Sequence, residues 1–365
     1  MKKLVSLFWA ACIALPLFAQ GKGKIVIPDL KGYVTLKCDF HIHTVFSDGL
    51  VWPTVRVSEA YREGLDAISI TDHLESRRYL KELEKHSNLS FNDLSRNIAY
   101  ELAQTTAEER GIILVRGSEI TRGMPPGHHN AIFLTNSDEL DKPDYMDAFR
   151  AAKSQNAFIY RNHPWWWYPP PPRDTALWLD EHTQLLQQGM LHGIEIVNGG
   201  KYSPDAHRWC LEKKLTMMAG SDAHAPICMA PDKYRSMTLV FARIATPEAI
   251  HEALKERRTA VYNEGYIIGE EKYLKELFEN ALEWSVKKTG KEVNITFSNR
   301  SGLTFHLKVA GNELNLPFVI APNGVQVFPT LLLENLQDGD VSFIVENFLV
   351  APNEGMGYTI NAKNL

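Results

Sequence analysis

Short apolar segments alternate with amphipathic segments along most of the chain, beginning at residue 34. The apolar segments are rich in β-branched residues and too short for typical helices, which indicates buried strands, and the segments between them show helical spacing of apolar positions. This alternation predicts an α/β domain with a mainly parallel sheet, either open or closed into a barrel. The predicted strands are 34–41, 67–71, 112–115, 131–134, 157–160, 193–197, 215–219 and 237–241. The predicted helices are 54–63, 94–109, 145–153, 176–188, 205–213 and 247–256.

The pattern changes after about Ser285. From there, segments such as Val341-Ser-Phe-Ile-Val alternate or run apolar, and Asn, Gly, Asp and Pro separate them without helical spacing. The change predicts a small antiparallel β domain, and the amphipathic segment Leu274–Lys288 predicts a helix that links it to the α/β domain. The predicted units are an α/β domain at 34–270, a linking helix at 271–288 and a β-rich domain at 289–365.

The first residues form a separate segment. Lys2 and Lys3 precede the almost entirely apolar stretch Leu4–Phe18, and Ala19 offers a small residue before a polar one. These are the charged, apolar and cleavage regions of a secretory signal, and the apolar stretch is too short for a stable membrane span. We expect residues 1–19 to be a signal peptide and the mature protein to be periplasmic or secreted, without a membrane segment. An uncleaved anchor is the alternative.

Composition and charge exclude some function classes. The chain has 365 residues, of which 44% are hydrophobic and 23% charged, and its net charge is −5. This is typical of a globular enzyme with ample material for a core. The charges are dispersed, so nothing indicates nucleic-acid binding. Without Cys12 in the predicted signal, the remaining cysteines are odd in number, which argues against a disulfide framework.

Side chains able to bind metals fall where the predicted strands end. In parallel α/β folds the carboxyl ends of the strands converge on one rim, so residues far apart in sequence are expected to meet there. Residues two apart on a strand share a face, which suits the pairs His41/His43 and Asp222/His224 for holding one ion. The candidate metal ligands are His41, His43, Asp48, His73, Glu119, His128, His129, His163, Asp222 and His224.

The ordered set of strand-end motifs resembles the PHP family, the polymerase and histidinol phosphatase superfamily of metal-dependent phosphoesterases. The resemblance covers roughly residues 36–265 and depends on DFHIHTVFSDG, ITDH, GSEIT, GHHN, NHP and GSDAH, in that order. It implies a distorted seven-stranded (β/α) barrel. It also implies a centre of two or three divalent transition-metal ions.

The resemblance assigns the ligands to separate ions. His41, His43, Glu119 and Asp222 would hold the first ion. Glu119 would bridge to a second ion, which His163 and one of His128 and His129 would also hold. Only one of these two histidines is expected to bind, because adjacent residues face opposite ways. Asp48, His73 and His224 would hold a third. Imidazole and carboxylate ligands without thiolate favour Zn, Mn or Fe over a pure Mg site.

Other residues beside these motifs are candidates for supporting roles. Asp39 and Asp72 adjoin ligands and either orient imidazoles by accepting their second N–H or cap loops. Arg161 lies two residues before His163 and is a candidate for gripping a phosphate oxygen, with an ordinary ion pair as the alternative; Arg122 and Lys201 are lesser candidates. The aromatic run that starts at Trp165 either stacks on a substrate ring or forms a hydrophobic lid.

The predicted activity is hydrolysis of a phosphomonoester or phosphodiester in a small organic phosphate or nucleotide, with a hydroxide held between the ions as nucleophile. Two alternatives remain. The same centre could cleave an amide or lactone, as in amidohydrolases, or the barrel could be inactive and carry a glycan- or protein-binding β domain. The sequence has no tryptophan after Trp284, which favours a structural role for the β domain, packed on the barrel or in a homodimer, over sugar binding.

Overall fold

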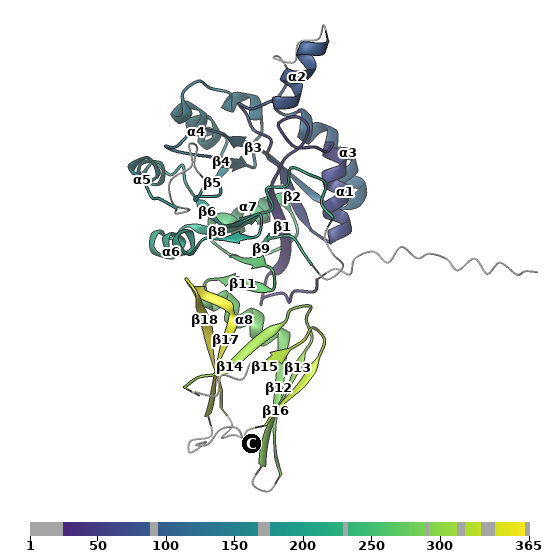
Figure 1. Cartoon of the computed structure of the whole chain (residues 1–365), viewed down its shortest axis with the longest axis vertical. Helices are drawn as coiled ribbons and strands as arrows, with labels where there is room; N and C mark the ends of the chain where they lie inside the picture. Colours follow the sequence, from purple (N-terminus) through teal and green to yellow (C-terminus); the bar gives the residue numbers. More distant parts are fainter. Residues whose placement is uncertain are drawn as a thin grey trace, which may run out of the picture.

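The computed structural model describes residues 25–87, 94–166, 176–228, 233–289, 292–311, 318–329 and 340–361. Figure 1 shows an α/β part and a β-rich part arranged one after the other along the long axis. The predicted signal peptide lies outside the described residues, and so does the part of the aromatic run that follows Trp166. Among the helices in the described ranges, none combines the length and apolarity needed to cross a membrane.

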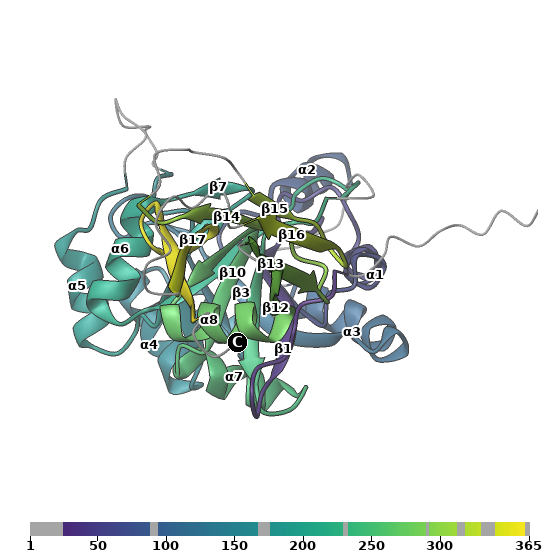
Figure 2. The same cartoon turned by 90° about the horizontal axis from the view of Figure 1, so that it is seen from below.

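The α/β part alternates strands and helices, much as the hydrophobic pattern predicts. Seen along the long axis, α1 and α3 lie on one side of the strands and α4, α5 and α6 on the other (Figure 2). In chain order the elements are β1 (Val34–Ile42), α1 (Pro53–Glu63), β2 (Ala67–Ile70), α2 (Arg78–His86), α3 (Ile98–Arg110), β3 (Ile113–Ile120), β4 (His129–Ile132), the 3₁₀ turn η1 (Ser137–Leu140), α4 (Tyr145–Ser154), β5 (Phe158–Arg161), α5 (Asp180–Gln187), β6 (Gly193–Asn198), β7 (Lys201–Tyr202), α6 (Pro204–Lys213), β8 (Thr216–Gly220), β9 (Met237–Ala242), α7 (Pro247–Lys255), β10 (Thr259–Asn263) and β11 (Tyr266–Gly269).

Local sequence explains where several helices begin and end. The side chain of Ser203 accepts a hydrogen bond from the Ala206 N–H at 3.2 Å, and Thr246 caps α7 in the same way, each followed by a proline at the first helical position. These residues satisfy N–H groups that the first turn leaves without a partner. Gly64 ends α1 in the left-handed conformation, φ 73°, which glycine adopts without a steric penalty.

Fifteen of the described strands form one mixed sheet, so the expectation of a mainly parallel sheet is wrong in part. The order is β15-β14-β17-β11-β10-β9-β1-β2-β3-β4-β5-β6-β7, with β8 beside β6 and β18 beside β17. β1, β2 and β3 are parallel neighbours, whereas β4 is antiparallel to both β3 and β5. Only a short loop separates β3 from β4, which favours antiparallel pairing over a helical crossover. This order shows a mixed α/β sheet, and the seven-stranded barrel count stays a prediction.

The predicted linking helix is too long. The helix α8 ends at Ala281, and β12 (Leu282–Thr289) follows directly, paired with β13 (Glu292–Asn299). Trp284 and Val286 are partly buried and alternate with exposed residues, which is the period of a strand. Pairing with β13 therefore outweighs the helical spacing of the preceding residues.

The β-rich part contains two sheets that share a core with α8. The remaining elements are α8 (Glu271–Ala281), β14 (Phe305–Val309), β15 (Phe318–Ile320), β16 (Val325–Pro329), β17 (Asp340–Ala351) and β18 (Glu354–Asn361). β12, β13 and β16 form a separate antiparallel sheet, whereas β17 pairs in parallel with β11 of the α/β part. Phe278 of α8 contacts Phe305 and Phe348 within this part. Tyr273 of α8 contacts Phe241 of β9, so apolar packing as well as backbone pairing joins the two parts.

A partly buried histidine outside the strand-end motifs provides a test of how the stability of the fold depends on acidic pH. Burial, with a smaller effect of Lys255, lowers the pKa of His192 from 6.5 to about 4. The unfolded chain therefore takes up this proton first, and stability falls as the pH drops from about 6.5 to 4. We expect His192→Gln to reduce this loss by up to about 3 kcal/mol. Urea unfolding at pH 7 and pH 4.5, with metals chelated throughout, measures the loss of stability between the two pH values.

The matched control is His86→Gln, which replaces an exposed histidine of α2. It should leave the difference between the two pH values unchanged. An identical pH dependence in His192→Gln and the wild-type protein would contradict the assignment.

Candidate metal centre

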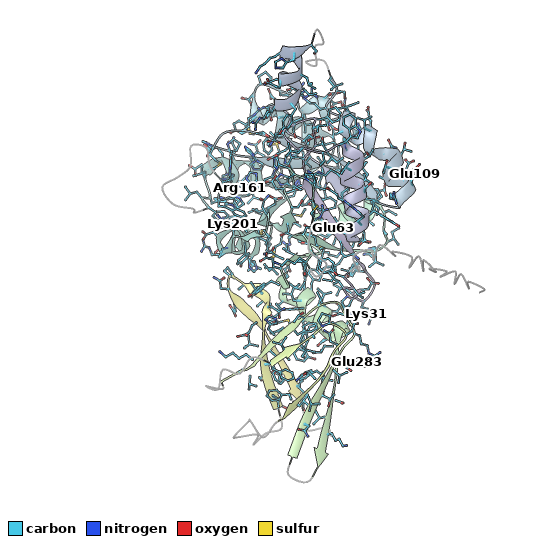
Figure 3. All side chains as sticks on the ribbon, turned by 45° about the vertical axis from the view of Figure 1, so that its right-hand side comes forward. Lys31, Glu63, Glu109, Arg161, Lys201 and Glu283 are labelled. Carbon is cyan, nitrogen blue, oxygen red and sulfur yellow. The ribbon has the colours of Figure 1, made fainter. Side chains whose placement is uncertain are left out.

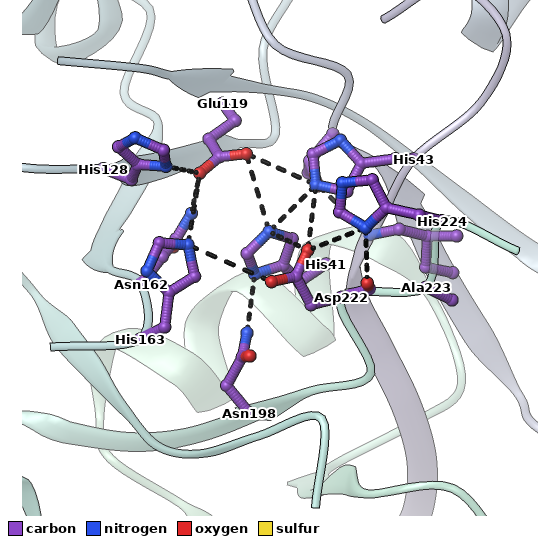
Figure 4. A network of polar contacts seen from close by, with 12 residues as sticks. His41, His43, Glu119, His128, Asn162, His163, Asn198, Asp222, Ala223 and His224 are labelled. Atoms are coloured by element: carbon purple, nitrogen blue, oxygen red, sulfur yellow. Dashed lines mark hydrogen bonds and ion pairs between the residues drawn. The ribbon is translucent and has the colours of Figure 1, made fainter. Parts of the chain in front are cut away.

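The strand-end side chains converge at one end of the α/β part. His41 lies one residue before the end of β1 and His43 directly follows the strand; His73 follows β2, and Glu119 lies in β3. His128, His163, Asp222 and His224 come from the loops next to β4, β5 and β8, and Figure 4 shows them around Glu119 with His41 and His43. Two of these loops have strained backbones, since His163 and Asp222 have φ values of 23° and 52°. Positive φ in non-glycine residues is uncommon and gathers at functional sites.

Glu119 lies at the centre of the cluster. Its carboxylate is fully buried, and its Oε2 atom is 2.9 Å from His73 Nδ1 and 3.3 Å from His43 Nε2. Its Oε1 atom is 2.9 Å from His128 Nδ1 and 3.7 Å from His163 Nε2. Figure 4 shows His128 and His163 on one side of this carboxylate and His43 on the other. Glu119 thus reaches histidines from both sides of the cluster.

Asp222 and Asp48 complete the cluster. Asp222 Oδ1 is 3.2 Å from both His41 Nε2 and His43 Nε2. Asp48 Oδ1 is 3.1 Å from His224 Nε2 and 3.5 Å from His73 Nε2. Donor atoms within 4.8 Å of one another form four overlapping groups: His43/Asp48/His73/His224, His41/His43/Asp222, His41/Glu119/His163 and His73/Glu119/His128.

The chemistry of these groups fits divalent metal ions. Burial alone would raise the pKa of the Glu119 carboxyl, but His73 and His128 hold that pKa well below its usual value. Burial would also raise the pKa of the Asp222 carboxyl, but His41 and His43 hold that pKa well below its usual value. The buried atoms Glu119 Oε2 and His128 Nδ1 have no hydrogen-bond partner of good geometry. Buried anionic oxygens and imidazole nitrogens without partners are the ligands that transition metals take.

Comparison with solved structures gives the family. The chain is similar to a two-domain protein from Bacteroides vulgatus that contains a predicted PHP-like metal-dependent phosphoesterase, with 44% sequence identity and a TM-score of 0.84 over 94% of this chain and 99% of that chain. The chain belongs to the PHP family. Because the alignment spans nearly all of both chains, this PHP protein and its relative share the β-rich part as well as the α/β part.

Two further solved structures have lower similarity to this PHP protein. A proposed metal-dependent phosphoesterase from Bifidobacterium adolescentis has 18% identity and a TM-score of 0.39, and an amidohydrolase from Chromobacterium violaceum has 17% and 0.36. Each comparison covers 52% of this chain and 88% of the other. No protein-family model and no curated protein matches the chain.

The structure separates the two adjacent histidines of the PHP motif GHHN. His128 faces Glu119, whereas His129 is buried on the opposite side, where its Nδ1 atom lies 3.1 Å from the Gly127 carbonyl oxygen and its ring contacts Phe149. Successive side chains of a strand point to opposite faces, which explains the separation. His129 therefore lies outside the cluster, and the candidate ligand at this position is His128.

Arg161 does not reach the centre, contrary to expectation. Its guanidinium is buried and donates hydrogen bonds to the carbonyl oxygens of Leu177, at 2.8 Å, and Pro164, at 3.3 Å. Burial lowers its pKa to about 9. The prediction assumed that strand alternation continues from Arg161 to His163, but β5 ends at Arg161 and the backbone of His163 turns into the left-handed region. Arg161 therefore holds the loop after β5.

The predicted roles of Asp72 and Asp39 in orienting imidazoles also differ from the structure. The Asp72 carboxylate accepts hydrogen bonds from the Thr44 N–H and hydroxyl and from the Ser47 hydroxyl. It caps the loop after β1, which is the alternative left open by the sequence. Asp39 accepts from backbone N–H groups and pairs with Arg235 Nη1 at 2.9 Å.

Glu195 performs the role predicted for those aspartates. It is fully buried in β6, and its Oε1 atom is 2.8 Å from His41 Nδ1. Its Oε2 atom accepts from the Asn198 side chain and from the backbone N–H of His163, so one carboxylate positions two candidate ligands. Such partners fix the orientation of a ligating imidazole. The only hint of Glu195 in the sequence is that an acidic residue interrupts the apolar strand Gly193-Ile-Glu-Ile-Val.

Two buried arginines hold the ligand-bearing loops together from behind. Arg56 of α1 donates to the carbonyl oxygens of His43, Ala223 and Ala225 at 2.8, 2.8 and 3.0 Å. It also pairs with Glu59 at 2.8 Å. Arg235 lies between two more buried carboxylates, those of Asp39 and Glu63. The end of β1 and the loop after β8 are therefore joined by charged groups that do not themselves face the cluster.

Proposed function

We propose that the protein is a metal-dependent hydrolase that cleaves phosphoester bonds of a small organic phosphate or nucleotide outside the cytoplasm. The observation that carries the proposal is the set of imidazole nitrogens and carboxylate oxygens around Glu119. The similarity to the Bacteroides vulgatus protein supports the class of metal-dependent hydrolase. The signal-like residues 1–19 support the location.

Divalent ions bound by these residues would offset the negative charge of a phosphate ester and lower the pKa of water towards neutrality. The donor set favours Zn, Mn or Fe, and two or three ions would share the donor atoms of the four overlapping groups. An anionic ester repels hydroxide, so a concentration of positive charge at this buried rim is what the reaction requires.

The chain itself supplies orientation. Glu195 holds the Nδ1 atom of His41, which leaves Nε2 directed at Asp222 and Glu119. The Asn162 side chain donates to Glu119 Oε1 at 3.0 Å and fixes the other end of the cluster. Because these partners are already in place, ions would meet ligands in nearly their final positions, which reduces the cost of binding.

Removal and return of metals tests the proposal. Purified protein treated with a chelator is expected to lose cleavage of p-nitrophenyl phosphate or bis(p-nitrophenyl) phosphate by at least about 1,000-fold, since a metal ion supplies several kcal/mol of transition-state stabilisation. Zn, Mn or Fe should restore it and Mg should not. Metal analysis before and after treatment gives the number of ions per chain.

The comparison substrate is p-nitrophenyl acetate, which has the same leaving group without phosphorus. Metal-dependent cleavage of the acetate alone would favour the amide or lactone hydrolase. Phosphoester cleavage that survives complete removal of the metals would show that the cluster around Glu119 is not the catalytic centre.

A further inference from the structure

We propose that Trp166 is a stacking surface beside the metal centre, and that the substrate is a phosphate ester whose leaving group carries a planar ring, such as an aryl or nucleoside ester. This inference rests on the proposed function and narrows its substrate class. Of the aromatic run in the sequence, it uses only Trp165 and Trp166, which the structure describes.

Trp166 is fixed directly beside two candidate ligands. Its ring centroid lies 4.7 Å from that of His128 and 5.6 Å from that of His163. Its backbone N–H donates to the His163 carbonyl oxygen at 2.8 Å, so the turn that presents the ring begins at a ligand. The indole therefore borders the second ion position that the family resemblance assigns to His128 and His163.

The same ring is also accessible. Trp166 is 46% exposed, although His128 and His163 beneath it are about 90% covered. A tryptophan used only to seal a core normally loses far more of its surface than this, because its large apolar area gains most from burial. Contact with the ligands on one side and water on another is the arrangement expected of a ring that receives a second ring.

A positive charge lies near this aromatic surface. Lys201 of β7 places its Nζ atom 5.2 Å from the ring of Trp165, the residue before Trp166. The β6–β7 hairpin that carries Lys201 also carries Asn198, which donates to Glu195 behind His41. Figure 3 places Lys201 in the α/β part, with Arg161 and away from Glu283 of the β-rich part. An anionic substrate with a flat ring matches an indole next to a cation.

The reaction balances with water alone. The P–O bond to the leaving group breaks, a P–O bond to the water oxygen forms, and a water proton ends on the oxygen of the departing alcohol or phenol. No oxidant or reductant takes part. Stacking on Trp166 would hold the leaving group while its phosphorus faces Glu119 and the ions, and would discriminate between esters by the ring they carry.

Paired substrates test the inference. Adenosine 5′-phosphate and ribose 5-phosphate, and their methyl diesters, carry the same sugar phosphate and differ in having adenine or a hydroxyl group at C1 of the sugar, so the ratio of their kcat/KM values reports stacking. We expect Trp166→Ala to lower this ratio by roughly 5- to 150-fold, which is what a stacking energy of about 1–3 kcal/mol per base produces. Trp166→Phe should keep most of the ratio because it keeps a ring.

The control is Tyr266→Ala, which removes another exposed aromatic residue, on β11; it should leave the ratio and the rates unchanged. Each variant is also analysed for metal content. An unchanged ratio in Trp166→Ala, or a loss of metals that lowers both rates equally, would overturn the inference and leave the phosphoesterase proposal standing. If the metal-loaded wild-type protein cleaves none of these esters, the proposed function itself fails.

Discussion

Glu119→Gln is expected to lower phosphoester cleavage by at least about 1,000-fold while the fold is retained. Glutamine has the shape of glutamate, but one of its two oxygens becomes an N–H₂ donor that cannot bind a cation. Glu119 belongs to two of the four donor groups, so the change weakens more than one ion position. Several kcal/mol of transition-state stabilisation depend on those ions. Steady-state kinetics and metal analysis of the purified variant measure the loss.

The control for Glu119→Gln is Glu248→Gln, at the exposed start of α7. It removes the same charge from an exposed position that belongs to none of the donor groups, and it should change neither metal content nor rate. Circular dichroism distinguishes a lost centre from an unfolded chain. A Glu119→Gln protein that binds the full number of ions and retains activity within about tenfold of wild type would show that Glu119 is not the shared ligand.

The candidate ligands could be predicted from the sequence because two independent regularities coincide. Strand periodicity places His41 and His43 on one face, and chain order places Glu119, His163 and Asp222 at the ends of other strands. The structure brings all of these together. Neither regularity depends on details of side-chain packing, which explains why these ligands could be predicted from the sequence alone.

The residues that the sequence reasoning missed or misplaced depend on tertiary contacts or on backbone turns. Glu195 is recognisable only once β6 is seen beside β1, because nothing local shows which imidazole it faces. The position of Arg161 could not be predicted because the backbone changes direction at His163, where the alternation of side chains along the strand ends. Arg56 acts through carbonyl oxygens that belong to distant loops, and backbone groups leave no mark in a sequence motif.

The missed β10–β11 hairpin has only a weak local signal in its turn. β10 and β11 form an antiparallel hairpin whose two turn residues, Glu264 and Gly265, have φ values of 48° and 88°. Positive φ at both central positions is the feature of the type I′ turn, which favours Asn or Asp followed by Gly. The sequence Asn263-Glu-Gly has glutamate at the first of these positions. Backbone pairing with β9 and β17 on either side outweighs that local preference.

The second large effect is expected for Arg56→Met. Methionine keeps much of the apolar bulk but leaves the buried Glu59 carboxylate unpaired, which should lower the free energy of unfolding by about 3–5 kcal/mol. It also removes the guanidinium donors from the carbonyl oxygens of His43, Ala223 and Ala225, of which Ala223 keeps the backbone N–H of His43 as a donor at 3.1 Å. We therefore expect metal affinity to fall by about 10- to 100-fold, the usual effect of losing an outer partner. Urea unfolding without metal and metal titration measure the two effects separately.

The double variant Arg56→Met/Glu59→Met separates charge balance from positioning. Removing the unpaired carboxylate should restore much of the stability, because a buried ion pair is often replaceable by apolar side chains. Metal affinity should stay low, since the guanidinium that donates to the carbonyl oxygens of both loops is still missing. Arg150→Met, which breaks an exposed pair with Asp147 on α4, is the control and should cost no more than about 1 kcal/mol. Full recovery of metal affinity in the double variant would show that Arg56 acts only as the partner of Glu59. Recovery of stability without recovery of metal affinity would show that Arg56 positions the loops of His43 and Asp222 for metal binding.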